Sequence, residues 1–441
     1  MLVHPASMPG AARTIGSPGP APTADRADDG LVLTARATSR QITAGDSDVA
    51  ITITVPAAGA HVRPPVALAI VIDTSGSMTG PWIAHAKAAA AKLVDALEPG
   101  DAFAVVTYAS EDVTIVPMGL ATAGAKASAR SAIDAVGADG GTCISCGITR
   151  GAAELAHPLL QNAVERIVLI SDGQATVGIR DRDELVALAA STAARGVSIS
   201  TVGVGIDFDE LTMMRLAATG RGNYYYVDTT DHLAAMFDRE LGGLAATVAA
   251  DVRLVLTDGQ GASIQEAYGY PFARTGTQVV IPIADLRAGE TRKVVVRTHV
   301  TAPTGPLAIA DVQLSWRRVA DGVGRRAKAT ALATVTTDQR AVATSIDLDA
   351  SAAAEQAVSA RALEDATRAY EERGPAAAQQ ILDRRVESAR AKGYLSPTTM
   401  SAIESDAHGA ASDFAAAPAP RSAAGAATKK AMRVKSYELA R

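Results

Sequence analysis

An uninterrupted apolar run at residues 66–72 leads directly into a turn that holds Asp73, Ser75 and Ser77. Continuous β-branched and aliphatic runs of this kind are typical of strands that are buried on both faces of a parallel sheet. In open α/β sheets, ligands collect beyond the carboxyl ends of such strands. The three side chains alternate along the turn, so their oxygens can point into one crevice, and oxygen-only ligands favour a hard cation. This feature therefore predicts a cation site at the end of a buried strand.

Residues 64–244 alternate apolar strand-like runs with helical segments, which is the pattern of a parallel α/β sheet. We expect strands at residues 66–72, 102–108, 113–116, 166–170, 198–204 and 223–227. We expect helices at residues 82–97, 125–136, 145–157, 181–195, 209–218 and 231–241. A short polar link joins the second and third strands, which predicts a hairpin at one edge of the sheet. The predicted fold class of this segment is a doubly wound, Rossmann-like α/β domain with a mainly parallel central sheet.

The segments on either side of this unit have different patterns. Residues 1–30 are rich in Pro, Ala and Gly and predict a flexible leader, whereas residues 31–63 contain two alternating strands. Residues 245–345 predict an all-β, sandwich-like domain, because short strands and turn residues follow one another without helical periodicity. Residues 350–410 predict a C-terminal helical segment, and residues 411–441 a flexible linker with a terminal peptide.

Three details refine this division of the chain. An isolated two-stranded hairpin is marginal in water, so we expect the strands before residue 63 to join the later β domain, with the α/β domain as an insertion. Gly374 followed by Pro375 is typical of one helix ending and the next beginning. The terminal peptide carries enough apolar residues for a docking segment, with a frayed end as the alternative; these residues are Met432, Val434, Tyr437 and Leu439.

Two further positions carry chemistry that matches the first turn. Thr142 comes before a predicted helix, and Asp172 follows a second buried strand. Because the carboxyl ends of parallel strands meet at one edge, we expect both residues to lie near Asp73. Taken singly, the two aspartates are explained as helix caps and Ser75 and Ser77 as turn formers. The joint occurrence of all five on an alternating frame favours a metal site.

This set resembles the metal-ion-dependent adhesion site of the von Willebrand factor type A family, with Asp73-x-Ser75-x-Ser77, Thr142 and Asp172 in the family's order. The resemblance covers residues 64–244. It implies that the two serines and the threonine supply direct hydroxyl ligands, and that both aspartates act directly or through water. In some family members, such a site serves folding rather than adhesion.

The ligand chemistry indicates which ion would bind. A compact, near-octahedral set of oxygens favours Mg²⁺, with Mn²⁺ as an alternative and Ca²⁺ less suited. Two carboxylates only just balance a divalent charge, and hydroxyls add none, so there is room for one more oxygen. An exposed Asp or Glu of a protein partner can supply that oxygen.

Cys143 and Cys146 flank the Thr142 loop and are the only cysteines in the sequence. One interpretation is two small buried residues at the start of a helix. Another is a reversible disulfide, a redox pair beside the metal. A zinc site needs about four ligands, which argues against zinc at this position.

Composition and motifs exclude several classes of protein. Lys and Arg number 42 against 47 Asp and Glu, a net charge of -5, and basic residues are not interleaved with aromatics, which argues against nucleic-acid binding. No apolar run reaches the roughly 20 residues of a transmembrane helix. The sequence shows neither a His-Glu-x-x-His helix nor a phosphate-binding loop nor a Gly-x-Ser-x-Gly elbow, which predicts a protein that is not an enzyme. The first residues do not form a signal peptide, which favours the cytoplasm, with an extracytoplasmic or cell-surface location as the alternative.

The sequence therefore predicts a non-enzymatic, Mg²⁺-dependent module that binds an acidic side chain of another protein. Two alternatives belong to other classes. One is a subunit that acts with a partner ATPase in metal insertion or complex remodelling. The other is a structural protein that self-associates through its β domain or its terminal peptide.

Overall fold

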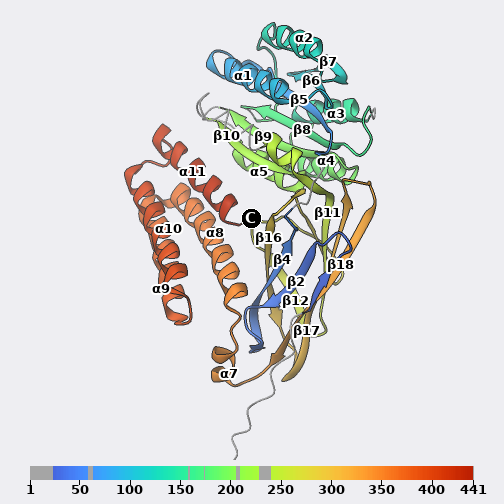
Figure 1. The fold of residues 1–441 in the computed structure, drawn as a ribbon. Coiled ribbons are helices and arrows are strands. Elements are labelled where there is room, and N and C mark those ends of the chain that lie inside the picture. Colours follow the sequence, from blue (N-terminus) through green and yellow to red (C-terminus); the bar gives the residue numbers. More distant parts are fainter. Residues whose placement is uncertain are drawn as a thin grey trace, which may run out of the picture.

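The computed structural model describes residues 23–57, 63–156, 159–172, 174–204, 209–227 and 240–440. Figure 1 shows three units: an α/β unit at the top, a two-layer β unit below it, and a set of helices along one side. Most of the predicted leader and most of the helix predicted at residues 231–241 lie outside the described residues. None of the described helices has the length and hydropathy needed to cross a bilayer.

The α/β unit contains a six-stranded sheet in the order β10-β9-β8-β5-β6-β7. Its strands are β5 (Val66–Asp73), β6 (Ala102–Tyr108), β7 (Asp112–Leu120), β8 (Val164–Ser171), β9 (Ser198–Val204) and β10 (Arg221–Val227). All neighbours are parallel except β6 and β7, which pair antiparallel at one edge. The predicted α/β fold, with its hairpin at the sheet edge, is confirmed.

Helices cover both faces of this sheet. They are α1 (Pro81–Ala96), α2 (Ala123–Asp134), α3 (Ile144–Leu155), α4 (Arg182–Ala194) and α5 (Glu210–Thr219), with a short 3-10 helix, η1 (Gly76–Met78), after β5. Successive residues of β5 face opposite sides: Ile72 packs in the core that contains Leu93 of α1, and Val71 in the core that contains Ile148 of α3. Burial on both faces explains why the strand is an unbroken apolar run.

The β unit consists of two sheets that share one hydrophobic core. The five-stranded sheet has the order β1-β2-β4-β16-β12 and the seven-stranded sheet the order β13-β14-β11-β17-β18-β3, with β15 also paired to β11. The strands are β1 (Ala24–Arg26), β2 (Val32–Ala37), β3 (Gln41–Ile42), β4 (Gly45–Thr54), β11 (Thr247–Asp258), β12 (Ala262–Ala267), β13 (Ala273–Thr275), β14 (Gln278–Pro282), β15 (Leu286–Arg287), β16 (Thr291–Val300), β17 (Gly305–Arg318) and β18 (Gly324–Val335). Ile51 of β4 and Leu254 of β11 illustrate the shared core, since both are fully buried in it.

Strands that precede and follow the α/β unit in the sequence pair within the five-stranded sheet. β4 and β16 are antiparallel, from Gly45 opposite Val300 to Thr54 opposite Thr291. The α/β unit therefore lies, in the sequence, between two strands that hydrogen-bond to each other. The boundaries of independent folding units stay a prediction.

The first strand lies inside the segment that we expected to be a flexible leader. β1 pairs with β2, and the Asp25 carboxylate accepts a hydrogen bond from the Lys328 amide at 2.8 Å. Its three residues carry no apolar alternation, so only the pairing with β2 and the contact with Lys328 reveal the strand.

The C-terminal segment is more ordered than we expected. Its helices are α7 (Gln339–Thr344), α8 (Leu348–Arg373), α9 (Pro375–Ala391), α10 (Pro397–Ala416) and α11 (Ala423–Leu439). α8 ends at Gly374 and α9 begins at Pro375, as predicted. The expectation of a flexible linker and peptide over residues 411–441 is wrong, because α11 occupies most of that segment. The start of α11 is rich in Ala and Gly and therefore suggested a linker. Ser422 is the N-cap of this helix, and its hydroxyl accepts a hydrogen bond from the Gly425 amide.

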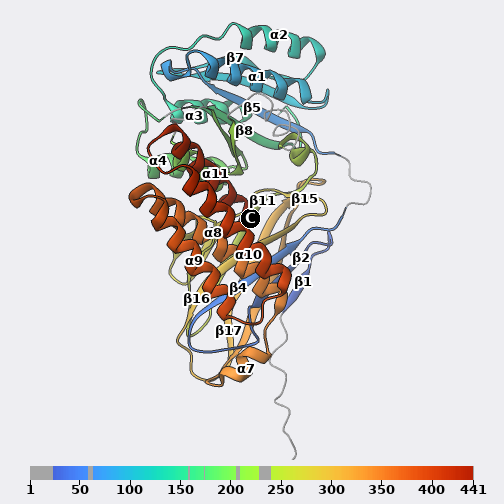
Figure 2. The same ribbon diagram turned by 90° about the vertical axis from the view of Figure 1, so that its left-hand side faces the viewer.

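α11 packs on two units at once, and Figure 2 shows it crossing from the other helices toward the α/β unit. Met432 belongs to the helical core, whereas Val434 and Tyr437 pack against the α/β core. Arg433 Nη1 donates to Glu210 Oε2 at 2.9 Å, and the Glu210 side chain is only 2% exposed. The apolar residues that suggested a docking peptide are thus used within the chain itself.

A second buried contact joins the α/β unit to the β unit. The Arg166 guanidinium donates to Glu240 at 2.6 Å and to Asp285 at 3.0 Å. Its Nε also donates to the Ser198 hydroxyl at 2.6 Å. Because Arg166 and Ser198 lie at the amino ends of β8 and β9, this contact is at the opposite end of the sheet from Asp73.

The shared core of the β unit can be tested with Ile51→Ala. Loss of this fully buried side chain should lower the free energy of unfolding by about 2–5 kcal/mol, because a cavity remains between the sheets. Urea denaturation measures the change. Thr54→Ala, at an exposed position of the same strand, is the control and should change stability by less than about 0.5 kcal/mol. Equal stability of the two variants would contradict the shared core.

The attachment of α11 can be tested with Arg433→Ala. This substitution leaves the Glu210 carboxylate buried without its cation and should destabilise the protein by about 3 kcal/mol. Thermal unfolding and proteolysis of the C-terminal segment report the effect. Lys435→Ala is the matched control, because its partner Asp406 is 38% exposed, and it should change stability by less than about 1 kcal/mol. Similar losses in both variants would mean that the buried pair does not anchor the helix.

Candidate metal site

The carboxyl ends of β5 and β8 lie side by side at one edge of the sheet. The strands are in parallel register, with Ile72 opposite Ile170. Asp73 ends β5, and Asp172 directly follows β8. Asp73 is fully buried and Asp172 is 9% exposed. The register thus brings together two carboxylates that are distant in the chain.

Hydrogen bonds through Ser75 and Ser77 link these carboxylates. Asp73 Oδ1 accepts a hydrogen bond from the Ser75 amide at 2.9 Å, and the hydroxyl oxygens of Ser75 and Ser77 lie 3.0 Å apart. Ser77 Oγ then donates to Asp172 Oδ1 at 3.0 Å. Ser75 is buried and Ser77 is exposed, so the site opens to solvent on the Ser77 side. Four of the five predicted residues therefore form one chain of hydrogen bonds.

Thr142, the fifth residue, lies on the loop before α3. This loop is tied to the first turn, because the Gly76 amide donates to the Gly140 carbonyl at 3.0 Å. The Thr142 amide donates to Thr176 Oγ1 at 2.8 Å, and its carbonyl accepts from the Thr176 amide at 2.9 Å. The loop is thus held between the segment that follows β5 and the segment that follows β8.

Two residues that we did not predict orient the Asp73 carboxylate. Ser171 Oγ donates to Asp73 Oδ2 at 2.6 Å, and the Tyr108 hydroxyl donates to the same oxygen at 3.3 Å. Both residues end strands that neighbour β5, and Tyr108 is directly opposite Asp73. Tyr108 ends one predicted strand and Ser171 directly follows another, but only the register of these strands shows that both side chains reach Asp73.

The environment of the carboxylates opposes their charge. Burial raises the pKa of Asp73, and hydrogen bonds from Ser171 and Ser75 partly offset this effect. Burial and the nearby Asp73 charge raise the pKa of Asp172 to about 6. Two carboxylates that repel each other in this way are stabilised as anions by a cation between them.

The donor set fits a hard divalent cation. It combines two carboxylates with hydroxyl groups, and hydroxyl and carboxylate oxygens suit Mg²⁺. Among the described residues, no cluster of three or more His, Cys, Asp or Glu side chains is placed to hold a metal ion. The donor set at the sheet edge contains only oxygen atoms, whereas zinc and iron sites typically use His or Cys ligands.

Cys143 and Cys146 form a disulfide across the first turn of α3. The loop that follows Asp172 packs against it. A side chain at Gly178 would place its Cβ 2.5 Å from Cys143 Sγ and 2.6 Å from Ser145 Oγ. Gly178 also has a φ of +69°, a conformation that favours glycine. The disulfide and this glycine thus fit closely together beside Thr142.

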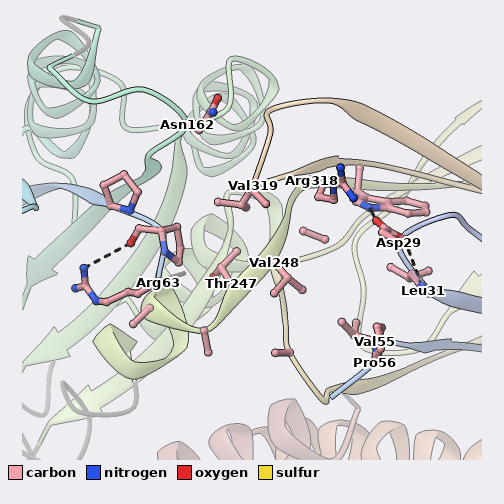
Figure 3. A pocket seen from close by; sticks show the side chains of 18 of the residues that line it. Asp29, Leu31, Val55, Pro56, Arg63, Asn162, Thr247, Val248, Arg318 and Val319 are labelled. Carbon is pink, nitrogen blue, oxygen red and sulfur yellow. Dashed lines mark hydrogen bonds between the residues drawn. The ribbon is translucent and has the colours of Figure 1, made fainter. Parts of the chain in front are cut away.

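A cavity of about 670 Å³ lies between the α/β and β units, away from the candidate metal site. Figure 3 shows Arg63 and Asn162 on one side and Val248 and Arg318 on the other. Pro65 also lines it, just before the start of β5, so the cavity is at the amino end of that strand. Both arginines already pair with carboxylates, Arg63 with Asp101 and Arg318 with Asp321. The cavity therefore contributes nothing to the donor set at the other end.

Residues 67–239 match the family model of the von Willebrand factor type A domain. The chain therefore contains a domain of this family, whose members commonly mediate metal-dependent protein interactions. Among curated relatives, the uncharacterized protein YfbK of Escherichia coli K12 is 32% identical over 42% of this chain and 32% of its own length. Inter-alpha-trypsin inhibitor heavy chain H1 of Mesocricetus auratus is 26% identical over 41% of this chain and 21% of its own length. The chain thus spans about a third or less of the length of these two relatives.

Two solved structures resemble most of the chain. A von Willebrand factor type A protein from Catenulispora acidiphila has a TM-score of 0.66 at 19% identity and covers 84% of this chain and 88% of its own. The ArnB paralog VWA2 from Sulfolobus acidocaldarius has a TM-score of 0.60 at 15% identity and covers 92% of this chain and 99% of its own. At such low identities these similarities show the fold alone.

The contact between Gly178 and the disulfide can be tested with Gly178→Ala. The new Cβ would overlap Cys143 Sγ, so overpacking of about 1–3 kcal/mol should add to the cost of the positive φ. Gly276→Ala is the control, because it has a φ of +59° with no atom within 4 Å of the new Cβ. That control should lose about 1 kcal/mol from backbone strain alone. Chemical denaturation compares the two, and equal losses would contradict a tight contact.

Proposed function

We propose that this protein is a Mg²⁺-dependent protein-binding module whose partner supplies an acidic side chain to the metal. The observation that carries the proposal is the chain of hydrogen bonds from Asp73 through Ser75 and Ser77 to Asp172 at a solvent-facing sheet edge. The domain's family supports the coarser statement of metal-dependent protein interaction. The residues that would hold the ion are Asp73, Ser75, Ser77, Thr142 and Asp172.

The chain's own groups would prepare such a site. Ser171 and Tyr108 hold one oxygen of Asp73, and the Ser75 amide holds the other, so the carboxylate keeps its orientation. Bound Mg²⁺ would supply an electrophilic centre that accepts a further oxygen ligand. Because the set has only two carboxylates, a third from a partner adds favourable charge rather than excess charge.

The surroundings of the site favour a protein as the ligand. Ser77 is exposed at the opening of the site. Val177, on the loop that holds Thr142, exposes 36% of its surface as an apolar residue. A partner that presents a carboxylate beside an apolar surface could contact the site at Ser77 and the apolar Val177 side chain together. We propose binding rather than catalysis, since members of the domain's family commonly mediate protein interactions.

Loss of metal binding in Asp73→Ala is the direct test. Wild-type protein should gain about 2.7 kcal/mol of stability when Mg²⁺ is at a hundred times its dissociation constant, and the variant should gain none. Thermal unfolding with MgCl₂ or chelator, and titration calorimetry, measure the two quantities. Ser77→Ala, at an exposed position, gives the same test without a change in the core. Asp134→Ala, which removes an exposed carboxylate of α2, is the control and should bind as wild type does.

Wild-type Mg²⁺ affinity in Asp73→Ala and Ser77→Ala would refute the assignment. Crosslinking with Mg²⁺ or with chelator then identifies the partner. Recovery of a nucleotide-binding protein would favour action with an ATPase, and growth of the particle mass in light scattering without a second protein would favour self-assembly.

A further inference from the structure

The Cys143–Cys146 disulfide lies at the junction of the two loops that carry the proposed ligands. Cys143 directly follows Thr142 and is the N-cap residue of α3, and Cys146 lies in the first turn of that helix. On the other side, the loop after Asp172 reaches the disulfide at Gly178. If either sulfur atom moves, both loops must therefore adjust.

Backbone hydrogen bonds connect these loops into one seam, which we define as residues 142–146 and 174–179. Thr142 exchanges hydrogen bonds with Thr176, and its carbonyl also accepts from the Val177 amide at 3.2 Å. Further along, the Ile179 amide donates to Ser145 Oγ at 3.1 Å. Gly178 lies between these hydrogen bonds, against Cys143 Sγ. The disulfide thus forms the packed centre of the seam.

The seam cannot accommodate two separated thiols without moving. Non-bonded sulfurs need more space than a bonded pair, so reduction forces them apart. Cys143 is fully buried, and even a methyl group on Gly178 would approach its sulfur to 2.5 Å. Interiors packed this closely respond to added volume by shifting their neighbours. The neighbour here is the loop that holds Thr142.

We propose that Cys143–Cys146 is a redox modification site whose reduction by a dithiol loosens the seam and weakens metal binding at Thr142. This proposal rests on the proposed function for its effect on the metal, but not for its effect on the seam. It adds control by thiol–disulfide exchange to a site that would otherwise respond only to metal and partner.

In this thiol–disulfide exchange, the dithiol is the reductant and supplies both electrons. Cys146 is partly exposed and Cys143 is not, so an incoming thiolate reaches the Cys146 sulfur. A mixed disulfide forms, the Cys143–Cys146 bond breaks, and Cys143 leaves as a thiolate that takes up a proton. The second thiol of the reagent then displaces Cys146, so the protein gains two thiols and the dithiol becomes its own disulfide. Oxidation by a disulfide reagent runs the same steps in reverse.

The test compares oxidised and dithiothreitol-reduced full-length protein. Because the sequence contains no other cysteine, any change that tracks with free thiols arises at this pair. Titration with MgCl₂ should give about fivefold weaker binding after reduction, a typical coupling between two sites. Hydrogen exchange without metal should become faster at the amides of Val177 and Ile179. Both changes should reverse on reoxidation.

Cys143→Ala/Cys146→Ala is the matched control. It contains no thiols, so neither its Mg²⁺ affinity nor its hydrogen exchange should respond to dithiothreitol. Equal Mg²⁺ affinity and equal exchange in both redox forms, with the thiols shown to be open, would overturn the proposal. Absence of Mg²⁺ binding in both forms would instead refute the proposed function, and hydrogen exchange would then decide the redox proposal alone.

Discussion

The parallel pairing of β5 with β8 is the constraint on which both the fold and the candidate site depend. This pairing puts Ile72 opposite Ile170 in the buried centre of the sheet and leaves Asp73 and Asp172 together beyond it. Because side chains alternate along a strand, a slip of one residue would send Asp73 to the other face. β6 extends the same arrangement by placing Tyr108 opposite Asp73. The apolar runs of β5 and β8 are buried only in this register. They therefore also determine where Asp73 and Asp172 lie.

At the candidate site, hydrogen bonds partly compensate for the burial of the Asp73 carboxylate. Asp73 is fully buried, yet it accepts hydrogen bonds from Ser171, Tyr108 and the Ser75 amide. Burial of a carboxylate is strongly unfavourable without such donors. These donors orient the side chain but bring no positive charge. Burial and the Asp73 charge raise the pKa of Asp172 to about 6.

The sequence patterns predict the elements whose burial is regular along the chain. They do not predict elements that form only through contacts with other segments. The strand ending at Asp73 was predictable because it is buried on both faces, and the start of α4 because Asp181 caps it. β1 was not, since three residues without alternation become a strand only beside β2. α11 was not, since its apolar residues serve two different cores rather than one face.

The same distinction holds at the candidate site. Asp73, Ser75 and Ser77 form a local pattern, and Asp172 repeats the position of Asp73 on a second strand. The roles of Tyr108 and Ser171 follow only from the register of their strands with β5. The bond between Cys143 and Cys146 was one of two alternatives, because a spacing of three residues at a helix start suits both. Contacts of Gly178, far along the chain, show what the cysteines pack against.

The described contacts of the other two units lie away from the candidate site. The β unit meets the sheet at the amino ends of its strands, where Arg166 binds Asp285. α11 lies on the flank formed by α5 and β10, where Arg433 binds Glu210 and Lys430 lies over the Tyr226 ring. Both contacts use charged groups that are largely buried, so each is expensive to break. The α/β unit is therefore fixed at one end and one flank, while Ser77 stays exposed at the opposite end, where a protein partner can approach.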